Sequence, residues 1–79
     1  MKEKDILGRI IVDPKIMVGK PVIKGTRLTV QHILGLLAQG ITAEDIMHEH
    51  PNLKREDIFA CLMFARDMLA DTTFASLSV

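Results

Sequence analysis

A change of hydrophobic period at Thr29 divides the chain into two parts. Before Thr29, short β-branched runs alternate with proline and glycine, which interrupt regular structure. After it, apolar residues recur at i, i+3, i+4 and i+7, the spacing of a helix that buries one face. These residues are Val30, Ile33, Leu34 and Leu37. The pattern predicts a mainly α protein in which a short N-terminal β-hairpin precedes the helices.

Two extended segments are predicted before the change of period. The run RIIV at residues 9–12 is β-branched and is closed by an Asp-Pro pair, which favours a turn. The second segment, Pro21–Ile23, leads into Gly25, which can adopt the positive φ of a tight turn. We therefore predict a small β-hairpin region over residues 9–28.

Three helices are predicted after the hairpin. The first has Thr29 as its N-cap and ends at Gly40. The second is capped by Thr42, with an Asp three residues later, and ends near His48, before a proline. The third and longest begins near Arg55, with acidic residues in its first turn, as the helix dipole favours.

The length and the cysteine content limit the architecture. With 79 residues, 48% of them hydrophobic, the chain supports a single domain spanning residues 1–79. Cys61 is the only cysteine, which excludes an internal disulfide and favours a reducing, cytoplasmic setting. No stretch reads as a signal peptide or membrane span. Small domains often gain stability by association, so we expect a homodimer or a higher homo-oligomer.

The zero net charge conceals a division along the chain. Residues 1–40 carry seven Lys or Arg against three Asp or Glu, a net charge of +4, whereas residues 41–79 carry three against seven, a net charge of −4. This asymmetry can steer a charged partner to one face, or bring the basic region of one copy to the acidic region of another. The alternative is a solvated surface with an uneven distribution of charge.

The third predicted helix carries more apolar residues than a single buried face can accommodate. Ile58, Leu62, Ala65 and Leu69 form one stripe, which we expect to meet the core. The other apolar residues are candidates for an oligomer or partner interface: Phe59, Met63, Phe64 and Met68. The alternative is that the N-terminal strands fold back and cover this second face.

The sequence predicts no catalytic, cofactor or metal site. The glycines of VGKPVIKGT are separated by five residues and lack the lysine of a phosphate-binding loop. His32, His48 and His50 have no recognisable ligand spacing. Cys61 lies in the apolar stretch FACLMF and is expected to be buried. The paired carboxylates, Glu44-Asp45 and Glu56-Asp57, lie at exposed helix starts, where capping explains them. A small enzyme using the histidines or Cys61 is a remote alternative.

Three segments resemble a small prokaryotic family, domain of unknown function 433. They are GKPVIKGTRLTV, ILGLLAQGITAEDI and HPNLKREDIFACLMFARD, and together they cover residues 11–71. Two residues depart from the family pattern: Lys54 stands where a helix-capping Thr is usual, and His50 precedes the proline where an aromatic is common. The resemblance implies a three-helix, helix-turn-helix-like (homeodomain-like) body over residues 29–71, with no established enzymatic activity.

The resemblance also implies a function. Such proteins are similar to antitoxins and are thought to be encoded beside nucleases with a PIN-like fold, which they would bind and silence. Many antitoxins also bind their own operator. We therefore expect a non-enzymatic antitoxin that neutralises a PIN-like nuclease and can bind operator DNA. The alternative is a homo-oligomeric DNA-binding regulator, or a structural module without a toxin partner.

Cationic residues are the candidates for contact with a nuclease or with DNA. In a helix-turn-helix the start of the third helix enters the major groove, which makes Lys54 and Arg55 candidates, although the carboxylates that follow would repel phosphates. We favour the basic hairpin residues Lys20, Lys24 and Arg27. Arg27 would enter the carboxylate site of a nuclease in place of its metal. The alternative is that Thr26 and Arg27 bond to the helical body and lock the hairpin onto it.

The C-terminal tail, residues 72–79, alternates in a strand-like pattern. Such a segment can add to the sheet edge of a partner, or it can be a frayed terminus.

Overall fold

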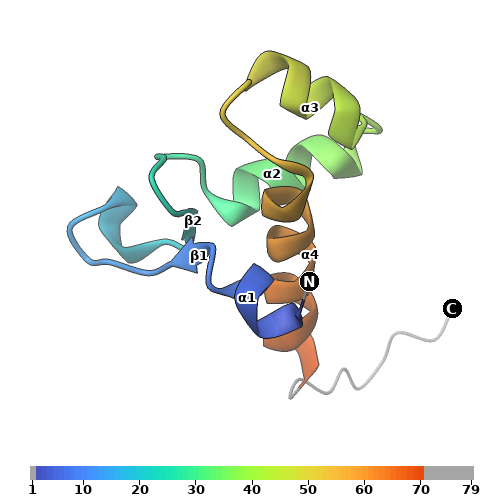
Figure 1. Cartoon of the computed structure of the whole chain (residues 1–79). Coiled ribbons are helices and arrows are strands. Elements are labelled where there is room, and N and C mark those ends of the chain that lie inside the picture. The colour runs from blue at the N-terminus through green and yellow to red at the C-terminus, as the bar shows by residue number, and fades with distance from the viewer. Residues whose placement is uncertain (1, 71–79) are drawn as a thin grey trace, which may run out of the picture.

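The computed structural model describes residues 2–70, within which the protein is mainly helical. The elements are α1 (Glu3–Leu7), β1 (Ile10–Ile11), the 3₁₀ turn η1 (Met17–Gly19), β2 (Val22–Ile23), α2 (Val30–Ala38), α3 (Ala43–Glu49) and α4 (Arg55–Ala70). In Figure 1, α4 runs through the middle of the molecule, with α1 beside its C-terminal half and α3 at the opposite end. No helix within this part of the chain is long and apolar enough to cross a bilayer.

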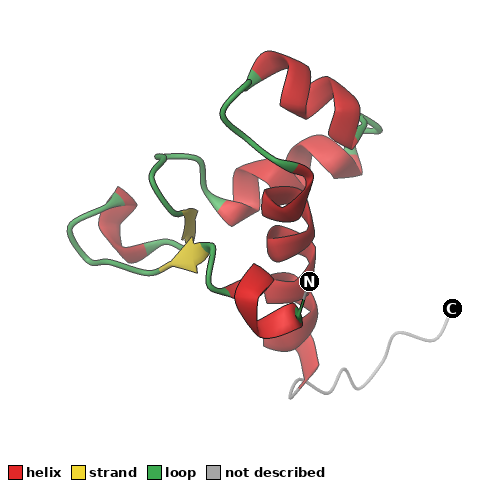
Figure 2. Ribbon diagram, viewed as in Figure 1, coloured by secondary structure: helices red, strands yellow, loops and turns green. Residues whose placement is uncertain are grey.

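The predicted β-hairpin is confirmed as a two-stranded antiparallel sheet (Figure 2). Ile10 pairs with Ile23, and Ile11 pairs with Val22. The strands are shorter than the RIIV run suggested, and both residues of β2 are buried. Gly25 follows β2 with φ of +81°, as the predicted tight turn requires.

The predicted N-caps of α2 and α3 are also confirmed. The Thr29 hydroxyl accepts a hydrogen bond from the backbone N–H of His32 at 3.0 Å. The Thr42 hydroxyl accepts one from the backbone N–H of Asp45 at 3.1 Å. Each cap satisfies a backbone donor that has no partner inside its helix, which is why these threonines fix where the helices begin.

α4 begins by a different device, because Lys54 has no side-chain oxygen with which to cap it. Instead, Oδ2 of Asp57 accepts a hydrogen bond from the backbone N–H of Lys54 at 2.9 Å. A carboxylate at the third helical position that reaches back in this way forms one half of a capping box. Asp57 thus compensates for the missing threonine.

The core lies where α2, α3 and β2 meet the first half of α4. Its central buried residues are Ile23, Val30, Ile33, Ile46, Leu53, Ile58 and Cys61. On another side of α4, the five-residue helix α1 contributes the buried side chain of Ile6. This helix was not predicted from the sequence.

The predicted core stripe of α4 is confirmed for Ile58, which is 2% exposed, but wrong for its two leucines. Leu62 and Leu69 are 46% and 56% exposed, whereas the buried residues of this helix are Asp57, Ile58, Ala60 and Cys61. The reason is that α1 and β1 pack on one side of α4 while α2 and α3 pack on another. The buried face therefore centres on Ala60 and Cys61, so the N-terminal segment does fold back, as the alternative proposed, but it covers only part of the helix. The predicted tail, residues 72–79, lies outside the described residues.

Candidate partner-binding surface

The basic residues of the hairpin lie on an exposed surface around β2. Lys20 precedes the strand, and Lys24 and Arg27 flank the turn that follows it; all three are exposed. The turn is held by Thr26, whose hydroxyl donates to the Ile23 carbonyl at 2.7 Å and accepts from a backbone N–H at 3.0 Å. These bonds are internal to the turn, so the predicted attachment of Thr26 to the helical body is wrong.

The Arg27 side chain forms no hydrogen bond or ion pair with any of residues 2–70. Its predicted structural role, a bond to the helical body, is therefore absent from this part of the chain. Arg27 is exposed, and within residues 2–70 none of its five N–H donors is used, so these residues leave the guanidinium available to an anionic group.

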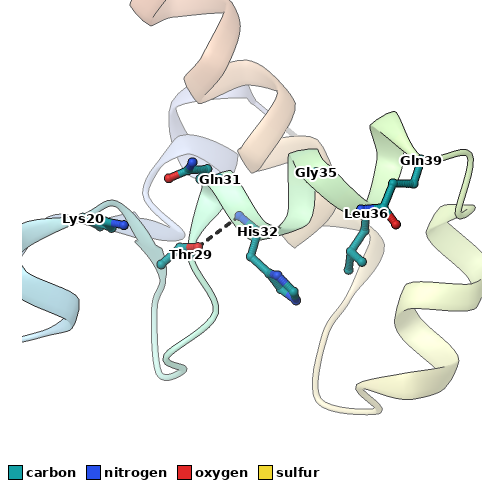
Figure 3. A pocket seen from close by; sticks show the side chains of 7 residues that line it. All are labelled: Lys20, Thr29, Gln31, His32, Gly35, Leu36 and Gln39. Carbon is teal, nitrogen blue, oxygen red and sulfur yellow. Dashed lines mark hydrogen bonds between the residues drawn. The ribbon is translucent and has the colours of Figure 1, made fainter.

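This surface continues along the first turns of α2 (Figure 3). Lys20 lies beside the capped end of α2, and His32 and Leu36 project from one side of the helix. With Gly35 they line an open concavity of about 400 Å³, whose charged and polar side chains, Thr29 excepted, are exposed. The concavity extends the basic surface and contains no buried polar side chain of the kind that fixes a small ligand.

A second concavity lies between α2 and α3. Its volume is about 470 Å³, and its lining comprises His32, Leu36, Ile41, Asp45, Ile46, Glu49 and His50. The structure thus brings two of the three histidines together, which their spacing did not predict, while His48 is exposed outside this lining. Within residues 2–70, no group of three or more histidines, cysteines or carboxylates is placed to hold a metal ion.

At the start of α4, the two predicted DNA-contact residues are exposed but differ in their surroundings. Nη2 of Arg55 donates to Oε1 of Glu44 in α3 at 2.8 Å, and this hydrogen bond lowers the pKa of the Glu44 carboxyl. The guanidinium is thereby partly engaged. Lys54 is exposed and uses only its backbone N–H in the Asp57 cap.

The prediction that Asp57 lies exposed at the helix start is wrong. Asp57 is 5% exposed, and its Oδ1 accepts a hydrogen bond from Nη1 of Arg9 at 3.0 Å. Arg9 therefore compensates the charge that was expected to repel phosphates. The sequence gives no local signal for this pair, because the two residues are 48 positions apart.

The outer face of α4 is apolar and accessible. Phe59, Leu62 and Leu69 are 43%, 46% and 56% exposed. Met68 is 64% exposed but lies on another side of α4, beside Pro21 and Leu34, and the predicted interface residues Met63 and Phe64 are half-buried. Leu62 and Leu69 were missed because they had been assigned to the core.

An ion pair ties this helix to α1: Nη2 of Arg66 donates to Oε1 of Glu3 at 2.6 Å, which raises the pKa of Arg66.

Cys61 is fully buried, as predicted. Burial, with the nearby Asp57 charge as a smaller cause, raises the pKa of its thiol to about 12. A thiol in this environment stays protonated at neutral pH, which makes it inert as a nucleophile.

Comparison with known proteins places this surface in a family. The family model described as "Protein of unknown function (DUF433)" matches residues 10–65. The chain belongs to the DUF433 family. An uncharacterized protein from Archaeoglobus fulgidus is 73% identical over 24 residues, which are 30% of this chain and 67% of that relative. No solved structure gives a significant match. The DUF433 match runs from β1 into α4 and so includes the basic hairpin and both concavities.

Proposed function

We propose that this DUF433 protein is a non-enzymatic, cytoplasmic antitoxin that binds and silences a PIN-like nuclease. The observation that supports the proposal is the state of Arg27, which is exposed, three residues from the exposed Lys24, and forms no hydrogen bond or ion pair with residues 2–70. The active site of such a nuclease is built from carboxylates that hold a metal. A planar guanidinium pairs well with carboxylates and would take the place of the metal's charge.

The affinity of the complex requires more than exposed cations. Exposed ion pairs contribute only about 0–1 kcal/mol each, whereas apolar surface contributes roughly 25 cal/mol for each Å² that is buried. The outer face of α4, with Phe59, Leu62 and Leu69 accessible, supplies such surface. We assign this face to the nuclease, and the basic hairpin to the orientation of the complex.

Operator DNA is a second candidate partner. In this proposal α3 and α4 act as a helix-turn-helix of the homeodomain-like class, and Lys54 and Arg55 lie at the start of the helix that would enter the major groove. The pairing of Asp57 with Arg9 supports this, because it removes one exposed negative charge from that position. The pairing of Arg55 with Glu44 weakens it, because binding would have to break or share that hydrogen bond.

An inhibition assay tests the antitoxin proposal. The nuclease activity of the adjacent gene's product is measured with increasing amounts of this protein and of its Arg27→Ala and Lys4→Ala variants. Loss of a charge that is desolvated in a complex costs about 2–5 kcal/mol. We therefore expect Arg27→Ala to raise the inhibitory concentration by at least tenfold, while Lys4→Ala, which removes an exposed cation from α1, leaves it unchanged.

Two results would argue against the proposal. Equal inhibition by the wild type and the Arg27→Ala variant would remove Arg27 from the interface. No inhibition by the wild type, together with upstream-DNA binding whose affinity falls steeply with salt, would favour the DNA-binding regulator. Circular dichroism of each variant confirms that it remains folded.

A further inference from the structure

The loop between β1 and β2 presents an apolar side chain at its tip. Val18 is 91% exposed and Met17 is 38% exposed. Both have positive φ, 57° for Val18 and 48° for Met17, a conformation that β-branched residues in particular avoid. Backbone hydrogen bonds from Gly19 to Ile16 and from Lys20 to Met17 close the turn. The turn therefore holds Val18 outward in a defined position, at a cost in backbone strain.

The loop around this tip is basic. Residues 12–27 contain four cations, Lys15, Lys20, Lys24 and Arg27, and one acid, Asp13, so four minus one gives a net charge of +3. The Asp13 carboxylate is already used within the loop, because it accepts a hydrogen bond from the backbone N–H of Lys15 at 2.9 Å. The tip is thus an apolar projection flanked by exposed lysines.

The concavity between α2 and α3 is complementary to this tip, because its lining is apolar and its rim is acidic. Leu36, Ile41 and Ile46 supply its apolar lining, and Asp45 and Glu49 of α3 supply carboxylates at its rim. Residues 43–49 contain three carboxylates and no lysine or arginine, a net charge of −3 with the histidine neutral. Its volume of about 470 Å³ falls within the range of roughly 300–1,000 Å³ that is typical of occupied sites.

A chain cannot fill its own concavity with its own loop. In Figure 1 the loop extends to the left of the sheet, whereas α3 lies at the top of the molecule, beyond α2. We propose that the Val18 tip of one copy docks in the α2–α3 concavity of a second copy. Apolar tip and apolar lining match, and the basic loop meets the acidic rim, so both halves of the contact are present in one sequence.

This contact is heterologous, because different surfaces of the two copies meet. Repeating it builds a ring where the rotation between copies closes, and a chain of copies where it does not. It shares the basic loop with the antitoxin proposal but involves neither the outer face of α4 nor a nuclease, so it is tested on the purified chain alone.

Two variants separate the halves of the contact. Val18→Asn removes the apolar tip, and asparagine adopts the left-handed region more readily than valine, so the fold is retained. Asp45→Lys combined with Glu49→Lys reverses the charge of the rim at two exposed positions. Losing the burial of one valine side chain weakens the dissociation constant by about tenfold to a hundredfold.

The test measures the mass of the purified full chain over a series of concentrations by sedimentation and light scattering. We expect the wild type to associate, with weaker association at high salt. For each variant alone, we expect the concentration at which half of the chains associate to be at least tenfold higher than for the wild type. Mixing them restores association into 1:1 complexes, because the intact loop of the rim variant fits the intact concavity of the Val18→Asn variant.

Leu62→Lys is the matched control, since it changes the exposed face of α4 and leaves both halves of the contact intact. It should keep the wild-type mass. A wild type that stays monomeric at every concentration overturns the proposal, as does a mixture that forms no complex. Dissociation by Leu62→Lys but not by Val18→Asn would show that copies meet through α4 instead. Urea unfolding of each variant confirms that a change in mass does not arise from loss of the fold.

Discussion

Asp57 caps α4 and also attaches the N-terminal segment to it. One carboxylate oxygen accepts the backbone N–H of Lys54, and the other accepts the Arg9 guanidinium. The side chain is almost fully buried, so its negative charge depends on both partners for stabilisation. The Arg9 side chain is 28% exposed, so the guanidinium keeps more of its contact with water than the carboxylate does.

Replacing Asp57 tests this double role. Asp57→Ala removes the cap, which is worth about 1 kcal/mol, and leaves Arg9 without its buried partner. We expect the free energy of unfolding to fall by about 2–4 kcal/mol, as measured by urea unfolding. Arg55→Ala is the control, since it breaks an exposed pair and should lower the free energy of unfolding much less. Equal losses in the two variants would contradict the role assigned to Asp57.

The raised pKa of Cys61 predicts a change of stability in alkaline solution. The thiol ionises near pH 9 in the unfolded chain but only near 12 in the folded one. Between these values the unfolded state binds fewer protons, so the free energy of unfolding falls as the pH rises above 9. Below pH 9 the contribution of this group is constant.

Urea unfolding between pH 8 and pH 10.5 measures this effect, with Cys61→Ala as the control. The wild type should lose more stability than the variant over this range, because the other titrating groups are common to both. The thiol should also react with Ellman's reagent only on unfolding. Parallel pH profiles, or rapid labelling of the folded protein, would show that Cys61 is accessible.

At the scale of the element, Gly35 weakens α2. It lies in the middle of a nine-residue helix, where glycine costs roughly 0.5–1 kcal/mol relative to alanine. A Cβ built at this position meets no atom within 4 Å. We therefore expect Gly35→Ala to raise the free energy of unfolding by about 0.5–1 kcal/mol, as read from the urea midpoint.

Gly40→Ala is the matched control for this change. Gly40 also has open space around it, but its φ is +90° at the end of α2, a conformation that costs alanine about 1–2 kcal/mol. The two substitutions add the same methyl group and should act in opposite directions. Destabilisation by both would mean that the space beside Gly35 is needed, for example by a neighbouring side chain.

The sequence predicted those elements whose signals are local. Thr29 and Thr42 each form their cap within three residues, and Gly25 takes the positive φ of its turn, so these features follow from short stretches of chain. Helix α1 has only five residues, below the length at which helical propensity decides the conformation, and it owes its place to packing on α4.

The buried face of α4 could not be predicted, because it depends on which elements pack around it. The periodicity of an apolar helix allows several stripes, and the chosen stripe contained Leu62, which is exposed. The candidate site was predicted in part. The exposure of Lys20, Lys24 and Arg27 agrees with expectation, but the Arg9–Asp57 pair and the placement of His32 and His50 around one concavity required the tertiary structure.

For the whole molecule, the division of charge along the chain becomes a division in space. Four of the seven cations of residues 1–40 lie on the loop and turn around β2, whereas three carboxylates lie in α3, at the top of the molecule in Figure 1. The basic surface is therefore shared between two uses: in one chain it can meet an anionic partner, and in another it can meet the acidic rim of a second copy. The apolar outer face of α4 adds a third surface for a nuclease.

The most direct measurement is co-purification of the tagged protein expressed with its adjacent gene, followed by mass determination of the complex by light scattering. We predict a stable complex with a nuclease-like neighbour, which Arg27→Ala and Leu62→Lys weaken and Lys4→Ala does not. Recovery of the protein alone, with a folded neighbour left unbound, would contradict the antitoxin function.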